Sequence, residues 1–93
     1  MIKEVCVENF TNVPLMIERG ADRIELNNDL SVGGTTPSFG VIKKTVEYAH
    51  KHDVPVIVMI RPRGGNFVYS EDELEIMIND IQICSLLGVD GVT

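Results

Sequence analysis

Hydrophobic residues in this chain of 93 residues follow two kinds of pattern, short runs typical of strands and longer runs with helical spacing. The strand-like runs cover residues 4–8, 22–26, 56–60 and 89–93. The helical runs cover residues 11–19, 38–52 and 70–87. A strand therefore precedes each predicted helix, and the last strand-like run ends the chain.

Residues suited to helix ends support these boundaries. Thr11 and Ser38 stand where the first two helices need an N-cap, and Ser70 followed by Glu73 forms a capping box for the third. Cys84 is expected to be a small core residue on the third helix. The other positions of that helix expected to be buried are apolar: Leu74, Ile78, Ile81 and Leu86.

The β-α-β-α-β-α-β order with short connections predicts parallel strands joined by right-handed crossovers. We interpret residues 1–93 as one α/β domain. It fits the front portion of a TIM-type (β/α)8 barrel, namely the first three βα units plus strand four, because a complete barrel has about 250 residues. The alternative is a small open sheet with helices on both faces that is complete in itself. In the barrel interpretation, uncovered strand edges predict either a homo-oligomer or a longer chain.

Strand alternation separates apolar positions from a mixed set that would face the barrel interior. The mixed set is expected to form a middle layer of Cys6, Glu25 and Met59 and an upper layer of Glu8, Asn27 and Arg61. Charges in an interior need partners, so Glu25 is expected to pair with Arg23 or Arg61. Alternatively, Glu25 or Glu8 could serve as a catalytic proton-transfer group.

Two arginines, Arg61 and Arg63, follow the apolar run at 54–60, where parallel α/β proteins hold ligands. Their guanidiniums suit a carboxylate or phosphate, and Gly64 with Gly65 would let the backbone approach it. We therefore predict a small anionic ligand. The alternative is that both arginines pair with carboxylates of the protein.

The loop before the second helix contains Gly33 and Gly34 and ends at the helix N-terminus, where free amides favour an anion. It is not a Walker loop, because no Lys-Ser or Lys-Thr pair follows the glycines. This loop is a candidate second wall of the anion site. It could equally be a long connection capped by Ser38.

Cys6 and Met59 are candidate copper ligands, because thiolates and thioethers select Cu(I). The competing interpretation is that both side chains fill a tight interior.

The composition and charge of the chain argue against nucleic acid and membranes as partners. A net charge of −6 and a pI of about 4.7 give no basic patch for nucleic acid. No apolar run reaches the length of a membrane span. Two cysteines without metal-site spacing are interpreted as reduced thiols, which predicts a cytoplasmic protein.

Three linked segments resemble the CutC family: residues 20–26, residues 33–40, and residues 60–67 followed by Tyr69 and Ser70. Their order and spacing match, and the likeness extends from Val5 to Thr93. The resemblance implies a TIM-type barrel and a cytoplasmic protein of copper homeostasis, in which cysteines are proposed to bind copper. Many members have a cysteine where this chain has Asn27. Cys6 matches the family's first-strand cysteine, so one thiol stands here in place of two.

The sequence thus supports two hypotheses. One is a copper homeostasis protein that binds Cu(I) through Cys6 and Met59. The other is a TIM-barrel enzyme acting on a small anionic substrate, with Arg61 and Arg63 as the clamp.

Overall fold

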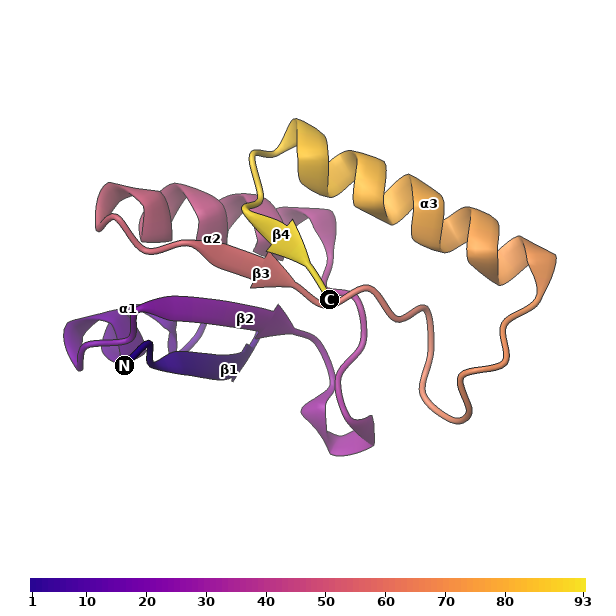
Figure 1. Ribbon diagram of the computed structural model, residues 1–93, viewed down its shortest axis with the longest axis horizontal. Helices are drawn as coiled ribbons and strands as arrows, with labels where there is room; N and C mark the ends of the chain where they lie inside the picture. Colours follow the sequence, from indigo (N-terminus) through magenta and orange to yellow (C-terminus); the bar gives the residue numbers. More distant parts are fainter.

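The computed structural model describes all 93 residues and contains four strands and three α-helices. They occur in the order β1 (Glu4–Glu8), α1 (Val13–Glu18), β2 (Arg23–Asn27), α2 (Phe39–Lys51), β3 (Val56–Val58), α3 (Glu71–Leu86) and β4 (Gly91–Val92). A single 3₁₀ turn, η1 (Leu30–Val32), interrupts the loop between β2 and α2. The strands form one parallel sheet in the order β1-β2-β3-β4 (Figure 1). The predicted βα units and strand order are confirmed.

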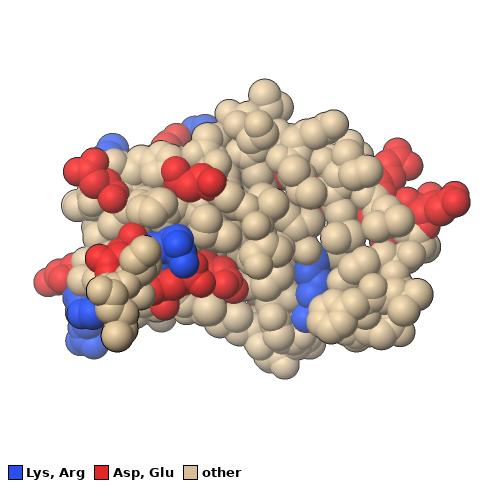
Figure 2. Space-filling view, in the orientation of Figure 1, with Lys and Arg blue, Asp and Glu red and all other residues tan.

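The core lies between the sheet and the helices and consists of the apolar positions of the alternating strands. Ile24, Leu26, Val56 and Val58 are fully buried, and α2 contributes Ile42, Val46 and Ala49. The parity that places these side chains in the core puts the mixed set of β1 and β2 on the opposite face. In the orientation of Figure 1, acidic side chains gather at both ends of the molecule and the middle is largely uncharged (Figure 2).

Two of the three α-helices begin at a serine whose side chain caps the helix. Ser38 Oγ accepts a hydrogen bond from Val41 N at 3.2 Å, and Ser70 with Glu73 forms the predicted capping box. The prediction for the first helix was wrong, because Asn12 rather than Thr11 is the N-cap residue and no side chain caps this end. Pro14 in the first turn supplies no N–H that needs a cap.

The register between strands corrects one predicted layer. Cys6 is level with Glu25 on the neighbouring strand, and Glu25 is level with Ile57. Met59 lies two residues beyond Ile57, which places it at the height of Asn27 rather than of Cys6. The pleat was predicted correctly, but the sequence does not reveal the offset between paired strands.

The predicted buried face of α3 was also wrong. The exposed fractions of four apolar side chains are substantial: Leu74 48%, Ile78 56%, Ile81 41% and Leu86 83%. The helix instead buries Cys84 against the core, as predicted, and packs Met77 partly against it. Helical periodicity identified an apolar helix, but it could not distinguish the side that meets the sheet from a side that meets nothing in these 93 residues.

Asp90 joins α2, β3 and the start of β4. Its Oδ2 lies 2.7 Å from His50 Nε2 and accepts a hydrogen bond from Val56 N at 2.8 Å. Burial alone would raise the pKa of this carboxyl, but the hydrogen bonds from His50 and Val56 more than offset it, so the pKa is lowered.

This junction predicts a pH dependence of stability. A carboxyl whose pKa is lower in the folded state stabilises the fold at pH values above its unfolded pKa, and this contribution disappears as pH falls through the folded pKa. Both side chains are more than a third exposed, so the contribution should stay below about 1 kcal/mol. Urea denaturation from pH 7 to pH 3 should show a smaller loss of stability on acidification in Asp90→Asn than in the wild type. Equal losses would contradict the assignment.

Candidate functional site

The face of the sheet opposite the helices carries Cys6 and Glu25 side by side on paired strands. The Cys6 side chain is exposed and Glu25 is half-buried. Partial burial raises the pKa of the Cys6 thiol, and the negative charge of Glu25 and a hydrogen bond to its carboxylate raise it further. The thiol therefore holds its proton at neutral pH more firmly than a free cysteine does.

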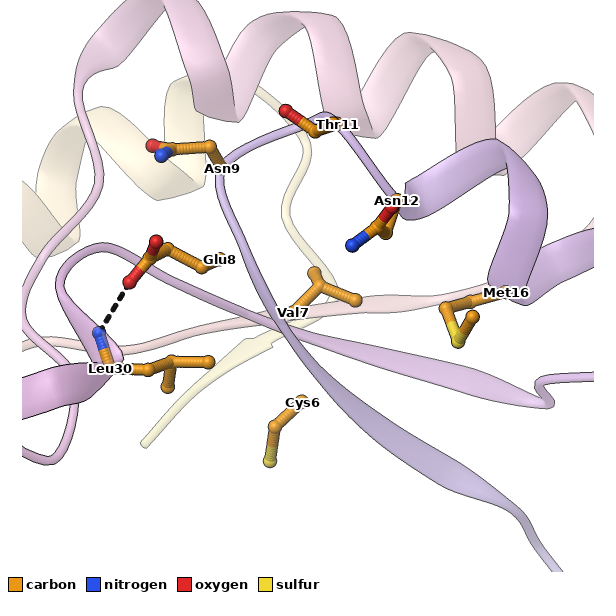
Figure 3. A pocket seen from close by; sticks show the side chains of 8 residues that line it. All are labelled: Cys6, Val7, Glu8, Asn9, Thr11, Asn12, Met16 and Leu30. Carbon is orange, nitrogen blue, oxygen red and sulfur yellow. Dashed lines mark hydrogen bonds between the residues drawn. The ribbon is translucent and has the colours of Figure 1, made fainter.

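A pocket of about 400 Å³ opens beside this thiol at the edge of β1. Cys6, Glu8 and Leu30 contribute to its walls, together with residues at the start of α1 (Figure 3). Glu8 Oε1 accepts a hydrogen bond from Leu30 N at 2.7 Å, so this carboxylate holds the loop after β2 against the end of β1. The two candidate carboxylates therefore lie on the same face, Glu8 at the pocket and Glu25 beside Cys6.

The expected pairing of Glu25 with an arginine is wrong. Arg23 forms its ion pair with Glu4, the residue level with it on β1. Glu25 Oε1 instead accepts a long hydrogen bond, 3.3 Å, from Asn27 Nδ2 on the same strand. Arg23 thus pairs with Glu4, which lies directly opposite it on the neighbouring strand, and not with Glu25 on its own strand.

Arg61 is buried and connects the two loops at the carboxyl ends of β2 and β3. Its Nη1 donates to Val32 O at 2.6 Å and to Gly34 O at 3.2 Å, and its Nη2 donates to Gly65 O at 2.9 Å. Only 8% of the residue is exposed, and no carboxylate lies within 4.0 Å of its guanidinium. Three backbone carbonyls therefore stabilise this buried charge in place of a carboxylate.

Arg63 is placed differently and organises its own loop. Its Nε lies 2.6 Å from Glu73 Oε2, and its other nitrogens donate to the carbonyls of Gly64, Asn66 and Val68. The alternative of a carboxylate partner thus applies to Arg63 and does not apply to Arg61. The structure brings Arg61, but not Arg63, against the Gly33-Gly34 loop.

Gly33 and Gly34 let that loop close over two polar side chains. Both have positive φ, +92° and +96°. A Cβ at Gly33 would lie 3.0 Å from Arg61 Nη1, and one at Gly34 would lie 2.4 Å from Asn27 Oδ1. The glycine pair is therefore required for close packing on Arg61 and Asn27, whether or not a ligand binds there.

Two further residues take part in this arrangement without having been singled out as site residues. Thr36 exchanges hydrogen bonds with the Arg61 backbone, since Arg61 N donates to its Oγ1 at 2.8 Å and Thr36 N donates to Arg61 O at 2.9 Å. The Phe67 ring lies 4.8 Å from Arg61 Cζ. Such contacts depend on how the loops after β2 and β3 pack together, which cannot be predicted from a local sequence pattern.

The donor set for copper is limited on this face. Cys6 is the one thiol there, since Cys84 is buried under α3. Met59 lies two strands away from Cys6 and one layer higher. No three His, Cys, Asp or Glu side chains are grouped to hold a metal ion. The residues therefore fit a Cu(I) contact through one thiol rather than a complete coordination site.

The link between Cys6 and Glu25 can be tested by thiol chemistry. Glu25→Gln removes the negative charge, so the pKa of the Cys6 thiol should fall and alkylation by iodoacetamide at pH 7 should become several-fold faster, since the thiolate is the reacting species. Rates measured by mass spectrometry from pH 6 to 10 would show the shift. Glu4→Gln, which removes a more weakly acting charge, is the matched control and should have a smaller effect. An unchanged profile in Glu25→Gln would contradict the coupling.

The packing at Gly34 gives a second prediction. Gly34→Ala should lower the free energy of unfolding by about 1–3 kcal/mol, because the new methyl group meets Asn27 and the backbone has positive φ. Gly40→Ala is the matched control, since nothing lies within 4 Å of its added Cβ, and it should leave stability unchanged or slightly raised. Urea denaturation measures both. Equal effects of the two substitutions would show that the loop does not need glycine at position 34.

Comparisons with known proteins agree with this fold. The chain matches the CutC family profile over residues 1–93. It is 58% identical over 92 residues to a CutC family protein of Enterococcus faecalis and 47% identical over 91 residues to the copper homeostasis protein cutC homolog of Homo sapiens. These alignments cover 99% and 98% of this chain but only 44% and 32% of the two relatives.

A solved structure supports the same assignment. The crystal structure of a CutC protein from Streptococcus agalactiae superposes with a TM-score of 0.95 at 47% identity, covering 99% of this chain and 44% of that chain. The chain therefore spans less than half the length of the relatives that it matches. The predicted parallel βα units of a TIM-type barrel are confirmed, and the chain belongs to the CutC family.

Proposed function

We propose that this chain takes part in copper homeostasis by binding Cu(I) at Cys6. Two observations support the proposal. The family includes a human relative named as a copper homeostasis protein. The second observation supports Cys6 as the binding residue: its thiol is exposed beside a pocket at the edge of the sheet, and thiolate is the ligand type that selects Cu(I).

The surroundings of Cys6 determine how such a contact would behave. The thiol must lose its proton before it can bind the metal, so binding should strengthen as pH rises toward the raised pKa of Cys6. Glu25 offers a hard oxygen, which Cu(I) does not favour, and Met59 stands in another layer. A contact through one thiol suits transient transfer of the ion better than storage.

The proposed location of this activity is the cytoplasm. Two unpaired cysteines are typical of a reducing compartment, where thiols remain available for Cu(I). No helix has the length and apolarity needed to cross a bilayer.

A second candidate function, an enzyme acting on a small anionic substrate, is favoured by one observation. Arg61 carries a buried positive charge without a carboxylate partner at the carboxyl ends of parallel strands. In this proposal Arg61 would bind the substrate, the loop at Gly33 and Gly34 would form the adjoining wall, and Glu25 or Glu8 would transfer a proton. Arg63 contributes by holding its loop through Glu73 rather than by meeting the substrate.

The copper proposal is tested by competition with a Cu(I) chelator under reducing, anaerobic conditions. Cys6→Ser should weaken Cu(I) binding at least about tenfold, because the strongest available ligand is lost. Cys84→Ser is the matched control, since that thiol is buried, and it should retain wild-type affinity when folded as judged by circular dichroism. Met59→Leu separately tests the thioether. Unchanged affinity in Cys6→Ser would exclude Cys6 as the copper ligand.

A further inference from the structure

Two polar atoms at the carboxyl ends of β2 and β3 are buried without any hydrogen-bond partner. One is the donor Arg61 Nε and the other is the acceptor Asn27 Oδ1. Their residues are 8% and 1% exposed. Unpaired buried polar atoms cost free energy and are uncommon in folded proteins, so a donor and an acceptor left unpaired on neighbouring strand ends require an explanation.

The unused donors of Arg61 lie on the part of the guanidinium that recognises oxyanions. Three of its five N–H groups are occupied by the carbonyls of Val32, Gly34 and Gly65. The remaining two are Nε–H and one N–H of Nη2, on neighbouring nitrogens. Two such donors bind a carboxylate or phosphate through two parallel hydrogen bonds.

Asn27 adds a requirement that a bare anion does not meet. Its Nδ2 donates toward Glu25, which leaves Oδ1 as an acceptor without a donor. Gly34 contacts both residues, since its carbonyl accepts from Arg61 Nη1 and a Cβ on it would lie 2.4 Å from Asn27 Oδ1. A ligand that satisfies both atoms must accept hydrogen bonds from Arg61 and donate one to Asn27.

We propose that Arg61 and Asn27 form a binding site for a small oxyanion that also carries a hydroxyl, such as a phosphate group in its protonated form. This inference rests on the second candidate function and names its ligand class. It is independent of copper binding at Cys6. The oxyanion accepts from Nε and Nη2 of Arg61, and its hydroxyl donates to Asn27 Oδ1.

In this proposal the ligand enters past the loop of residues 64–68. The centroid of the Phe67 ring lies 4.8 Å from Arg61 Cζ, yet Phe67 as a residue is 74% exposed, so little packing opposes its displacement. Gly64 and Gly65 precede it, and Gly65 has positive φ, +87°. Binding would move the Phe67 ring aside while Arg63 and Glu73 hold the far end of the loop.

The probes are inorganic phosphate and sulfate at pH 6, because phosphate keeps a hydroxyl at this pH and sulfate has none. Isothermal titration calorimetry on the wild-type chain should show tighter binding of phosphate than of sulfate. Arg61→Lys should weaken phosphate binding about tenfold, because lysine lacks the planar donor pair. Arg63→Lys is the matched control and should change phosphate affinity little.

Asn27→Ser removes the carboxamide acceptor and should reduce the preference for phosphate over sulfate. A second readout serves if Arg61→Lys fails to fold, namely the Arg61 Nε–H resonance in a ¹H-¹⁵N spectrum of the wild type, which should shift as phosphate is added. No shift of this resonance up to millimolar phosphate would overturn the proposal. Equal weakening by Arg61→Lys and Arg63→Lys would do the same. Phosphate binding without turnover of phosphate esters would retain the site and reject the enzyme.

Discussion

The carboxyl end of this sheet depends on the buried guanidinium of Arg61. It ties the β2–α2 loop to the β3–α3 loop through carbonyls of Val32, Gly34 and Gly65. Thr36 reinforces the same junction through the Arg61 backbone. Because the charge has no carboxylate partner, each carbonyl is needed to offset its desolvation. If one loop moved away, the guanidinium would lose those hydrogen bonds and would hold the other loop less firmly. Gly33 and Phe67 pack directly against the same guanidinium.

The two arginines show why equal residue types in one motif need not have equal roles. Arg63 lies on the loop before α3, within reach of the Glu73 that also caps this helix. A hydrogen bond from Ser70 N, and then the nearby Arg63 guanidinium, lower the pKa of Glu73, which favours the carboxylate that the ion pair needs. Arg61 follows β3 and is buried between two loops, where it meets backbone carbonyls and no acid lies within 4.0 Å. A two-residue step along the chain therefore separates a structural ion pair from an unpaired charge.

The fold could be predicted from the sequence because each element is specified locally. Alternation defined β1 and β2, and Ser38 and Ser70 defined the starts of two helices. The candidate site was harder to predict from the sequence, because its geometry depends on strand register and on contacts between loops. Met59 illustrates the first limit, since the pleat gave its face correctly while the strand offset moved it a layer above Cys6. Arg23 illustrates the second, since its pairing with Glu4 instead of Glu25 depends on which residues face each other across two strands.

The face opposite the helices holds two chemically different environments at different heights. In the lower one, partial burial and then the negative charge of Glu25 raise the pKa of the Cys6 thiol and disfavour a further negative charge. In the upper one, Arg61 leaves two donors unused, which favours a negative charge. A soft cation and an oxyanion therefore would not compete for the same side chains. Asn27 contacts parts of both environments, since its Nδ2 donates to Glu25 and its unpaired Oδ1 packs against Gly34, whose carbonyl accepts from Arg61. Its side chain thus connects Glu25, beside the Cys6 thiol, to the loop that packs against Arg61, so a substitution at position 27 should affect both environments.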